Sequence, residues 1–437
     1  MSTTVISVVL AAFATTACAL DAPAIVTVQA APPRSVFDRE GPAREDGSAA
    51  IAWNELAYQL AFAEDKFLTF KGHRAFALMH LAMHDALNTI HSVYGRYAYS
   101  GDHVPGADPI AAAAQAAYEV LRSQYPGAKT ALDAELGRWL GRVNGGPPKA
   151  RGIELGRSTA TAILAKRQND GWDVAGTYTF RSEPGQYQTT PDWNGFVLQP
   201  GFRHAKPFAL VAPSQFRPPP PPDLASQLYT SALDEVKSVG AASGASRTAE
   251  QTAYAIWWME FAEGSVNRLA RELLAEAHTN LWVASRLFAH LNLALFDVYI
   301  AVWDAKYEYN HWRPYTAVRQ AASDGNAATD PDATWEPLRP TPPFPEYVSA
   351  HAAGCAVTFD LMRRVFGENT SFAMRTVTAP PDMPTRSFGS FTAAAAECAD
   401  SRVRLGWHFR YATDAGATLG RQVAAHVAST SLTPTRR

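Results

Sequence analysis

Apolar side chains recur every three to four positions through most of the chain, the spacing that places them on one face of an α-helix. Early examples are Trp53, Leu56 and Leu60. Glycine and proline interrupt the pattern and divide it into separate helices. The predicted helical stretches are 50–92, 109–124, 128–143, 149–170, 223–239, 246–262, 265–276, 279–309, 350–366 and 400–428. We therefore predict an all-α fold with little strand.

Two helix-rich regions flank a stretch of different character. Residues 171–216 are rich in Gly, Pro, Thr, Tyr and Trp, which is typical of a long irregular connection with room for a short hairpin. Pro218–Pro222 adds a stiff polyproline segment, and Asp223 is a good N-cap for the next helix. The expected organisation is an N-terminal helical bundle at 50–170, a Pro-rich connection at 171–222 and a C-terminal bundle at 223–430.

The N-terminus has the features of an export signal. The run from Val5 to Leu20 is apolar and rich in small residues, and Ala17-Cys18-Ala19 matches an A-x-A cleavage site. These features predict a signal peptide at 1–19 and a secreted or periplasmic protein. Because no Lys or Arg precedes the run, an uncleaved anchor or a lipidated Cys18 are alternatives. Residues 20–49, rich in Ala, Pro and charge, are predicted to form an extended or disordered lead-in.

Composition narrows the class of protein. The 437 residues are 47% hydrophobic, enough for a sizeable core, and the net charge of −2 implies no nucleic-acid-binding surface. After the signal, the most apolar stretch is Leu287–Trp303. It contains His290 and Asp297, so we predict a buried core helix and no integral membrane span. Cys355 and Cys398 lie in helical patterns, where two small core residues are a better interpretation than a disulfide.

Chemically active residues gather in three stretches of the last third of the chain, 306–314, 345–351 and 401–408. They supply fixed cations, a hydroxyl and imidazoles, from Lys306, Arg313, Ser349, His351, Arg402 and His408. Such a set suits a tetrahedral oxyanion. Arg forks and a Lys ammonium neutralise its oxygens, while a hydroxyl and an N–H at a helix start donate further hydrogen bonds.

The spacing of these residues supports a single site. Lys306 and Arg313 are seven residues apart, which on one helix places them on a shared face about 10 Å apart along the axis. Ser349 follows a Pro-containing stretch and precedes an apolar run, so a helix is predicted to begin there. Gly406 predicts a break in the third stretch, with His408 near the start of a new helix.

The three stretches match the motifs of a known superfamily. Residues 306–314 match K-x6-R-P in full, residues 348–351 match P-S-G-H loosely, and residues 401–412 match S-R-x5-H-x3-D except at the last position. The chain therefore resembles the superfamily that joins vanadium-dependent haloperoxidases with type 2 phosphatidic acid phosphatases and soluble bacterial acid phosphatases. Segments 217–258 and 80–86 resemble its bacterial haloperoxidase-like branch, so the resemblance covers most of the chain from about residue 50.

The resemblance implies two related four-helix bundles, with the active site in the C-terminal half. A short internal echo agrees with related halves, because Leu81-Ala-Met-His-Asp85-Ala is similar to Leu293-Ala-Leu-Phe-Asp297-Val.

The resemblance also assigns a role to each residue of the oxyanion site. Lys306, Arg313 and Arg402 would hold the equatorial oxygens. Ser349 would donate a hydroxyl hydrogen bond, and the N–H of Ala350 would donate another. Taken singly, an arginine is usually a solvated charge and a serine a helix cap, so the assignment depends on the motifs occurring together.

The two histidines of the motifs carry the chemistry that the resemblance implies. His408 would supply the axial nitrogen, which coordinates vanadium in a peroxidase or attacks phosphorus in a phosphatase. His351 would be the acid–base group, since an ordinary imidazole pKa of about 6.5 suits proton transfer.

Aromatic and acidic residues near the motifs extend this assignment. Trp303 and Phe344 fall where fungal chloroperoxidases carry the aromatic pair of the halide pocket, so the resemblance assigns them to that pocket, with core packing beside the site as the alternative. Glu260 falls where related haloperoxidases place an acidic partner for the second arginine. We therefore expect Glu260 to pair with Arg402, with Glu263 as a competing candidate.

Three positions depart from the superfamily pattern. Val348 replaces proline and Ala350 replaces glycine, which requires a negative φ at position 350. Ala412 replaces the aspartate that would orient His408 and raise its basicity. Asp414 would lie about 200° further around a helix, so we expect a main-chain carbonyl to take that role.

Histidines in the N-terminal region invite a different interpretation. His80 and His84 are one helical turn apart beside Asp85, and His73 and His91 lie nearby. No third ligand at a recognised spacing accompanies them, so we predict core or boundary histidines and not a metal site.

Two reactions are compatible with the same oxyanion site. The preferred hypothesis is a vanadium-dependent haloperoxidase with a vanadate cofactor, which oxidises chloride or bromide with hydrogen peroxide to hypohalous acid that halogenates a small organic acceptor. The alternative is an exported acid phosphatase, in which His408 forms a phosphohistidine and His351 protonates the leaving alkoxide. The aromatic pair and the two-bundle length favour the peroxidase. A non-enzymatic oxyanion-binding protein is disfavoured because both histidines are present. Neither halide preference nor oligomeric state follows from the sequence.

Overall fold

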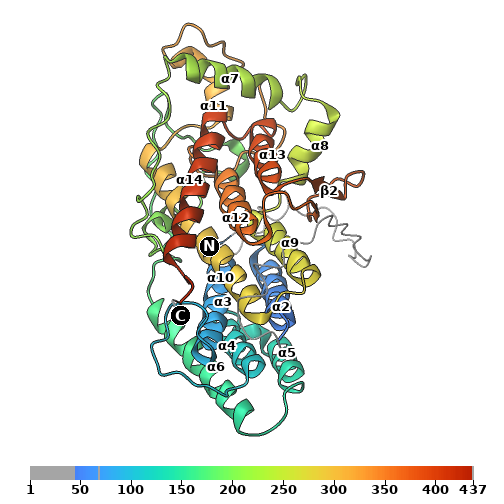
Figure 1. The fold of residues 1–437 in the computed structure, drawn as a ribbon. Coiled ribbons are helices and arrows are strands. Elements are labelled where there is room, and N and C mark those ends of the chain that lie inside the picture. The colour runs from blue at the N-terminus through green and yellow to red at the C-terminus, as the bar shows by residue number, and fades with distance from the viewer. Residues whose placement is uncertain (1–44, 67–68, 436–437) are drawn as a thin grey trace.

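The computed structural model describes residues 45–66 and 69–435, and the regular secondary structure within these residues is helical apart from one two-stranded sheet (Figure 1). The predicted all-α class is confirmed. The N-terminal helices lie at one end of an elongated molecule, and the orange and red C-terminal helices lie toward the other. The predicted signal peptide, Cys18 and nearly all of the predicted lead-in lie outside the described residues.

The N-terminal half consists of short-looped helices packed side by side. They are α2 (Ser48–Asp65), α3 (Lys71–Ile90), α4 (Pro109–Gln124), the 3-10 turn η1 (Pro126–Ala128), α5 (Lys129–Leu140) and α6 (Pro147–Lys166). The sequence explains where α4 begins, because Asp108 caps it and Pro109 fills the first helical position. A Cβ on Gly156 would lie 2.5 Å from the carbonyl oxygen of Ala112, so glycine lets α6 pack closely on α4.

The second half follows an irregular connection that holds the 3-10 turns η2 (Pro191–Trp193) and η3 (Pro200–His204). Its elements are α7 (Gln227–Val239), α8 (Ala249–Trp257), α9 (Ala262–Glu276), α10 (Leu281–Tyr309), α11 (Pro314–Arg319), η4 (Ala321–Ser323), α12 (Ala350–Phe366), β1 (Phe372–Arg375), β2 (Thr385–Phe388), α13 (Phe391–Arg404) and α14 (Arg410–Thr430). The antiparallel β1–β2 hairpin pairs Phe372 with Phe388 and was not predicted. The hairpin that the sequence allowed for at 171–216 is replaced by turns and bends.

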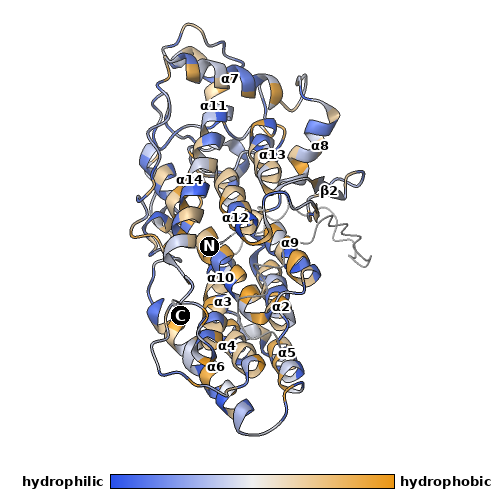
Figure 2. Cartoon of the chain, in the orientation of Figure 1, coloured by the Kyte–Doolittle hydropathy of each residue, from blue (hydrophilic) through white to orange (hydrophobic). Residues whose placement is uncertain are grey.

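The long helix α10 joins the two halves. It packs against α2, α3 and α9 and also against α12 and α14. It is long and apolar enough to cross a membrane, but its apolar window is completely buried by the rest of the chain, which confirms the predicted core helix. Peripheral helices such as α5 and α7 instead carry both hydrophilic and hydrophobic residues (Figure 2). Because both halves contact α10, the border between the two predicted bundles stays a prediction.

Several helix boundaries differ from the sequence prediction. The stretch at 50–92 forms two helices, since Lys66 adopts a left-handed conformation that closes α2. Ser226, and not Asp223, caps α7 by accepting a hydrogen bond from the N–H of Tyr229. The stretch at 400–428 is divided between α13 and α14, as the break predicted at Gly406 requires.

A disulfide joins Cys355 of α12 to Cys398 of α13, so the prediction of two unpaired core residues is wrong. Helical periodicity describes one helix at a time and contains no information about how closely two helices approach. The bond links the helices that carry His351 and Arg402, each of which lies four residues from the cysteine of its own helix. The disulfide therefore ties together two elements of the predicted site.

Candidate active site

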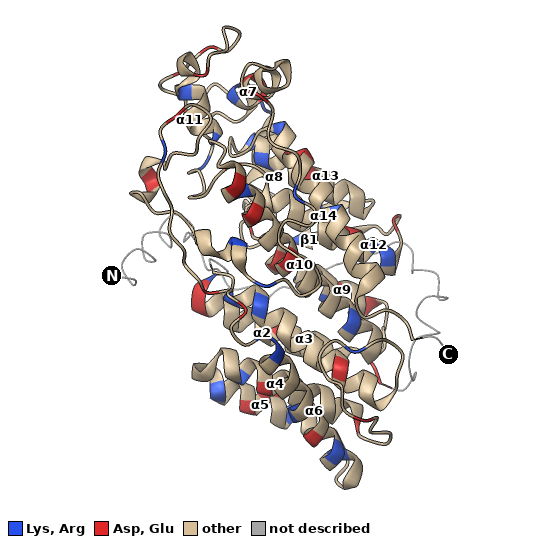
Figure 3. Cartoon of the chain, turned by 90° about the vertical axis from the view of Figure 1, so that its left-hand side faces the viewer, with Lys and Arg blue, Asp and Glu red and all other residues tan. Residues whose placement is uncertain are grey.

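The predicted oxyanion site is built on buried positive charge. Along the chain, positions of Lys and Arg are interspersed with positions of Asp and Glu (Figure 3). Lys306, Arg313 and Arg402 are each 0% exposed. Removing a cation from water costs several kcal/mol unless a counter-charge or hydrogen bonds offset the loss. The surroundings of these cations therefore decide what the site can bind.

Lys306 and Arg313 reach the site from different elements. Lys306 lies in the last turn of α10, and its Nζ donates to the carbonyls of Pro345 and Glu346, both at 2.9 Å. The chain leaves α10 at Asn310, which adopts a left-handed conformation. Arg313 lies beyond this turn as the N-cap residue of α11, so the predicted shared helix face is wrong. The turn nevertheless brings the two cations to the ring of Phe344, whose centroid is 5.0 Å from Lys306 Nζ and 4.8 Å from Arg313 Cζ.

Arg402 lacks the carboxylate partner that the sequence analysis expected. Its Nη2 donates to the carbonyl of Trp258 at 2.9 Å, and its Nε donates to Ser401 Oγ at 2.9 Å. Glu260 pairs instead with Arg268 of α9 at 2.8 Å, so the predicted Glu260–Arg402 pair is wrong. The competing candidate, Glu263, accepts from the hydroxyl of Tyr299 at 2.9 Å.

The electrostatic result at Arg402 follows directly. Burial lowers the pKa of Arg402 to about 9, and no carboxylate among the described residues forms an ion pair with it. An anion bound beside this guanidinium would therefore be stabilised by a charge that the protein leaves uncompensated.

The helix start predicted at Ser349 is confirmed. Ser349 caps α12 by accepting from the N–H of Ala352 at 3.4 Å, and its own N–H donates to the carbonyl of Ala412 at 3.0 Å. α12 begins at Ala350, whose N–H belongs to the first turn and has no acceptor within the helix. The helical backbone at Ala350 has a negative φ, so alanine replaces the usual glycine without backbone strain.

Glu346 is a functional residue that the sequence analysis missed. Its Oε1 lies 2.8 Å from Nδ1 of His408 and also accepts from the N–H of Phe409 at 3.0 Å. This carboxylate makes the contact expected of the aspartate that Ala412 replaces, so the prediction of a main-chain carbonyl is wrong. Glu346 is the only carboxylate in the stretch 345–351, which was the available signal.

The charge state of His408 follows from these neighbours. Burial lowers the pKa of His408 well below its ordinary value, and the charges of Arg313 and Lys306 lower it further. Burial raises the pKa of Glu346 to about 8, although the same two cations oppose this shift. When Nδ1–H donates to Glu346, Nε2 keeps its lone pair, and it lies 3.1 Å from Arg313 Nη1. The imidazole therefore presents a nucleophilic or ligating nitrogen to the cations.

His351 occupies the position of the predicted acid–base group. It lies in the first turn of α12, and its ring stacks on Phe261 with centroids 5.5 Å apart. Burial lowers its pKa well below the ordinary value, and the charge of Arg402 adds to this shift. His351 is consequently neutral near pH 7 and able to accept a proton.

Unpartnered polar atoms identify what the site lacks. Within residues 45–66 and 69–435, no hydrogen-bond partner reaches Arg313 Nη2, Arg402 Nη1 or His351 Nε2, although all three atoms are buried. Each buried donor left without an acceptor costs about 1–3 kcal/mol. Lys306, Arg313, Arg402 and His351 all act on the pKa of His408, so they surround one site. The oxygens of a tetrahedral oxyanion would accept from the two guanidinium groups, and a protonated oxygen would donate to the neutral His351, so the residues fit vanadate or phosphate.

The predicted aromatic pair lies beside the cations. The rings of Trp303 and Phe344 are 5.1 Å apart and tilted by 45°. Phe70, at the start of α3, packs edge-on against Trp303 at 4.9 Å and stacks on Phe202. The N-terminal half thus supplies part of the wall, a contribution that the sequence analysis did not anticipate.

Among the N-terminal histidines, His73, His80 and His84 are buried in the core and His91 is exposed at the end of α3, in agreement with the predicted core or boundary positions. His80 Nε2 lies 2.9 Å from Asn54 Nδ2, and His84 Nε2 lies 3.1 Å from the carbonyl of Gly95. Burial lowers the pKa of both imidazoles to about 3. Asp85, beside them, accepts hydrogen bonds from three consecutive N–H groups, those of residues 97–99.

Comparison with known sequences agrees with this geometry. Residues 286–435 match the family model described as the VCPO second helical-bundle domain. The chain is also similar to the vanadium chloroperoxidase of Curvularia inaequalis, at 29% identity with 33% of this chain covered. The match spans 29% of that relative's own length.

Solved structures share the fold over a longer range. A bacterial vanadium-dependent iodoperoxidase superposes with a TM-score of 0.76 at 23% identity, covering 91% of this chain and 100% of that one. The holo form of a bacterial vanadium-dependent chloroperoxidase superposes with a TM-score of 0.69 at 20% identity, covering 89% and 97%. The chain therefore shares its fold with these bacterial vanadium-dependent haloperoxidases, and residues 286–435 match the VCPO second helical-bundle domain.

Proposed function

We propose that this protein is a vanadium-dependent haloperoxidase, which oxidises a halide with hydrogen peroxide to hypohalous acid. The reaction consumes one proton, because hydrogen peroxide, halide and a proton give hypohalous acid and water. Chloride and bromide are the proposed halides. The similarity to a vanadium chloroperoxidase and the shared fold support the proposal, but the site itself carries it.

The proposal rests on two buried guanidinium groups whose N–H donors lack hydrogen-bond acceptors. Arg313 Nη2 and Arg402 Nη1 are buried, and neither has a partner within the described part of the chain. The three buried basic side chains Lys306, Arg313 and Arg402 outnumber the one buried carboxyl group beside them, that of Glu346, so the site favours an anion. Vanadate bound there would act as a Lewis acid toward hydrogen peroxide and the halide.

The protein side chains would hold the cofactor and manage protons. Lys306, Arg313 and Arg402 would neutralise the oxyanion, and Ser349 with the N–H of Ala350 would donate hydrogen bonds to it. His408 would ligate through Nε2, held in that tautomer by Glu346 at Nδ1. This arrangement gives Glu346 a positioning role.

His351 would move the proton that the reaction requires. Its neutral imidazole can accept a proton from hydrogen peroxide as the peroxide enters the site. A bound anion would offset the charges of Arg402 and Lys306, which now lower the pKa of His351. The pKa would then rise toward its ordinary value, so the same group could return the proton near neutral pH.

The aromatic wall supports a halide substrate in preference to a phosphate ester. Trp303 and Phe344 are nearly buried, and the ring of Phe344 contacts both Lys306 and Arg313. The positive edges of aromatic rings suit a weakly hydrated anion. A phosphatase has no comparable use for such a wall beside its cations.

Halogenation of a diketone acceptor by the purified protein tests the proposal. Chloride, bromide and iodide would each be supplied with hydrogen peroxide, with and without orthovanadate, beside hydrolysis of p-nitrophenyl phosphate without vanadate. We expect vanadate-dependent halogenation that His408→Ala abolishes and that His103→Ala, a change at an exposed histidine, preserves. Phosphate ester hydrolysis alone, inhibited by vanadate, would instead establish the phosphatase and overturn the peroxidase.

A further inference from the structure

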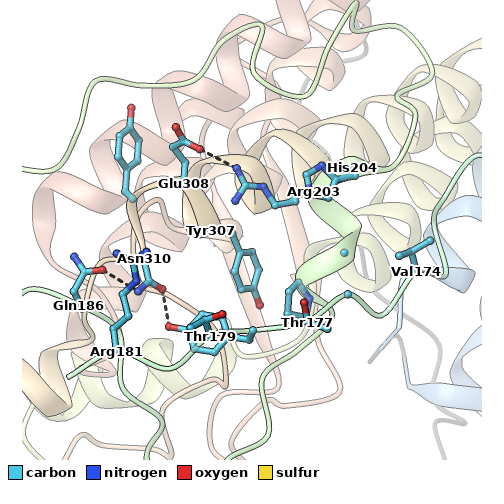
Figure 4. Close-up of a pocket in the computed structure, with 15 residues that line it drawn as sticks. Val174, Thr177, Thr179, Arg181, Gln186, Arg203, His204, Tyr307, Glu308 and Asn310 are labelled. Carbon is cyan, nitrogen blue, oxygen red and sulfur yellow. Dashed lines mark hydrogen bonds and ion pairs between the residues drawn. The ribbon is translucent and has the colours of Figure 1, made fainter. Parts of the chain in front are cut away.

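A separate pocket of about 520 Å³ lies beside the C-terminal end of α10 (Figure 4). That volume lies within the range of small-molecule sites in proteins, about 300–1,000 Å³. The irregular connection before η3 forms one wall, and the last turn of α10 forms another. Tyr307 stands in the middle, between the paired Arg203 and Glu308 on one side and the segment of Thr177 and Thr179 on the other. None of these residues belongs to the oxyanion site.

The pocket retains positive charge. Glu308 is already neutralised, because it accepts from Arg203 at 2.9 Å and from Arg217 at 3.0 Å. Arg181 lines the pocket, is exposed, and forms no ion pair within the described residues. Arg203 Nε is buried and likewise has no acceptor there. The two arginines of the lining, Arg181 and Arg203, outnumber its one carboxylate, Glu308, so an anionic group would find donors available.

Aromatic and apolar surface borders the same charges. The rings of Tyr178 and Tyr307 approach edge-on with centroids 6.1 Å apart, and Phe180 packs edge-on against Tyr178 at 5.2 Å. Phe180 is 58% exposed and Val174, which lines the pocket, is 51% exposed. Large apolar side chains that remain exposed beside a cavity mark a binding surface. A ligand with an aromatic ring and a carboxylate would complement both the rings and the arginines.

Only a thin wall separates this pocket from the aromatic pair of the oxyanion site. Tyr307 follows Lys306 in the chain, so the two side chains leave α10 on different faces. The hydroxyl of Tyr307 donates to the carbonyl of Leu198 at 2.7 Å, and Trp303 Nε1 donates to the same carbonyl at 3.4 Å. Leu198, Tyr307 and Trp303 therefore separate the pocket from the proposed halide site, which Trp303 and Phe344 border.

We propose that this pocket binds the organic acceptor and that the acceptor is an aromatic carboxylic acid, such as a phenolic acid. The halogenation part of this inference rests on the proposed function, which supplies the hypohalous acid. The ring would attack the halogen of the hypohalous acid, the oxygen–halogen bond would break, and the displaced ring proton would leave with hydroxide as water. One C–H bond is replaced by one C–halogen bond, so the step balances.

Calorimetric titration of the full-length protein with 3-(4-hydroxyphenyl)propionate tests the binding site without any turnover. The matched probe is 4-ethylphenol, which has the same ring and no carboxylate. We expect the acid to bind at least about tenfold more tightly than 4-ethylphenol. Arg181→Gln should abolish that preference, whereas Arg421→Gln, a change at an exposed arginine of α14, should preserve it. Phe180→Ala should weaken both probes equally.

Equal affinity for the two probes, or an unchanged preference in Arg181→Gln, would overturn the proposal. Steady-state halogenation adds a second test, in which Arg181→Gln should raise KM for the acid about tenfold while kcat and the KM for 4-ethylphenol stay unchanged. If the protein halogenates the acid and Arg181→Gln leaves the KM for the acid unchanged, the proposed acceptor site is also overturned. Failure of halogenation with intact selective binding would instead overturn the proposed function and leave an aromatic-acid site.

Discussion

The arginines buried around Asp170 in the N-terminal half and the arginine Arg402 of the oxyanion site have opposite kinds of partner. In the N-terminal half, Arg74 and Arg167 both donate to the carboxylate of Asp170 at 2.9 Å, and Arg167 also donates to the carbonyl of Pro207 at 2.7 Å. In the C-terminal half, Arg402 is buried just as deeply and forms no carboxylate pair within the described part of the chain. In the first arrangement a carboxylate of the protein neutralises the arginines, whereas in the second the positive charge stays available for a ligand.

Buried histidines show the same contrast. His80 contacts an amide of Asn54, and no cation perturbs its pKa. His408 contacts Glu346 and Arg313, and the positive charges around it lower its pKa beyond the effect of burial. Burial of a histidine is therefore uninformative by itself, and the charges that face it distinguish a core residue from a reactive one.

The largest expected effect separates these two histidines. His408→Ala should reduce halogenation by about a thousandfold or more, because the ligating nitrogen is lost. His80→Ala should leave activity unchanged and lower the free energy of unfolding by about 2 kcal/mol, since Asn54 loses its partner. Activity assays and chemical denaturation of both variants measure the difference. Equal losses of activity would remove the distinction between the two halves.

Replacing the arginines by methionine should change stability in opposite directions. Arg74→Met removes a partner of the buried Asp170 and should cost about 3 kcal/mol of unfolding free energy. Arg402→Met removes an uncompensated buried charge, so the protein without ligand should become more stable while it loses affinity for sulfate. Thermal unfolding with and without sulfate provides the measurement. A lower Tm for ligand-free Arg402→Met would contradict the assignment of Arg402 as an uncompensated charge.

Glu346→Gln sharpens the comparison within the site itself. Glutamine can still accept a hydrogen bond from His408 Nδ1 but cannot ionise when the imidazole gains positive charge, so halogenation should fall by about 10–100-fold with little loss of stability. Glu260→Gln is the matched control, because Glu260 pairs with Arg268 outside the site. That control should retain full activity. The role given to Glu346 fails if Glu346→Gln behaves like the control.

Oxyanion affinity should decrease as pH rises. The pKa of Glu346 is raised to about 8 and that of Arg402 is lowered to about 9. Above pH 8 Glu346 ionises and adds a negative charge, and above pH 9 Arg402 loses its positive charge. Both changes oppose an anion, so sulfate, whose own charge is constant here, should bind about tenfold more weakly at pH 9.5 than at pH 7. Calorimetry measures the sulfate affinity at each pH, and Glu346→Gln should remove the decrease in affinity near pH 8. Tighter binding at high pH would contradict these assignments.

Local features of the fold could be predicted from the sequence because they depend on neighbouring residues. Helical periodicity located α10 and α12, and the capping residue Ser349 marked the start of α12. Gly406 marked the break before α14, where it adopts a φ of +77° and where a Cβ would lie 2.7 Å from the carbonyl oxygen of Gly240. The motif residues could be named together because the resemblance grouped them.

Side-chain partners could not be predicted, because they depend on the tertiary approach of distant segments. Glu346 lies 62 residues from His408, and Cys355 lies 43 residues from Cys398. Glu260 pairs with Arg268, only eight residues later in the chain, and not with the distant Arg402 that was expected. In each case several candidates of the right chemistry were present along the chain, and only the packing of the helices selected one.

The similarity between residues 81–86 and 293–298 shows both what the sequence could predict and what it could not. Asp85 accepts from the N–H groups of residues 97–99, and Asp297 accepts from those of residues 208–210. Each half therefore uses a buried aspartate of the similar sequence to fix an irregular segment. The sequence revealed the similarity, but the structure was needed to identify its physical role.

The most direct test of the account is a crystal structure of the protein soaked with orthovanadate. We predict density for a single oxyanion bonded to His408 Nε2, with Lys306, Arg313 and Arg402 contacting its oxygens. His408→Ala should retain the fold and lose that bond. Vanadate bound elsewhere, together with halogenation that survives His408→Ala, would contradict the claim that these buried cations form the catalytic site.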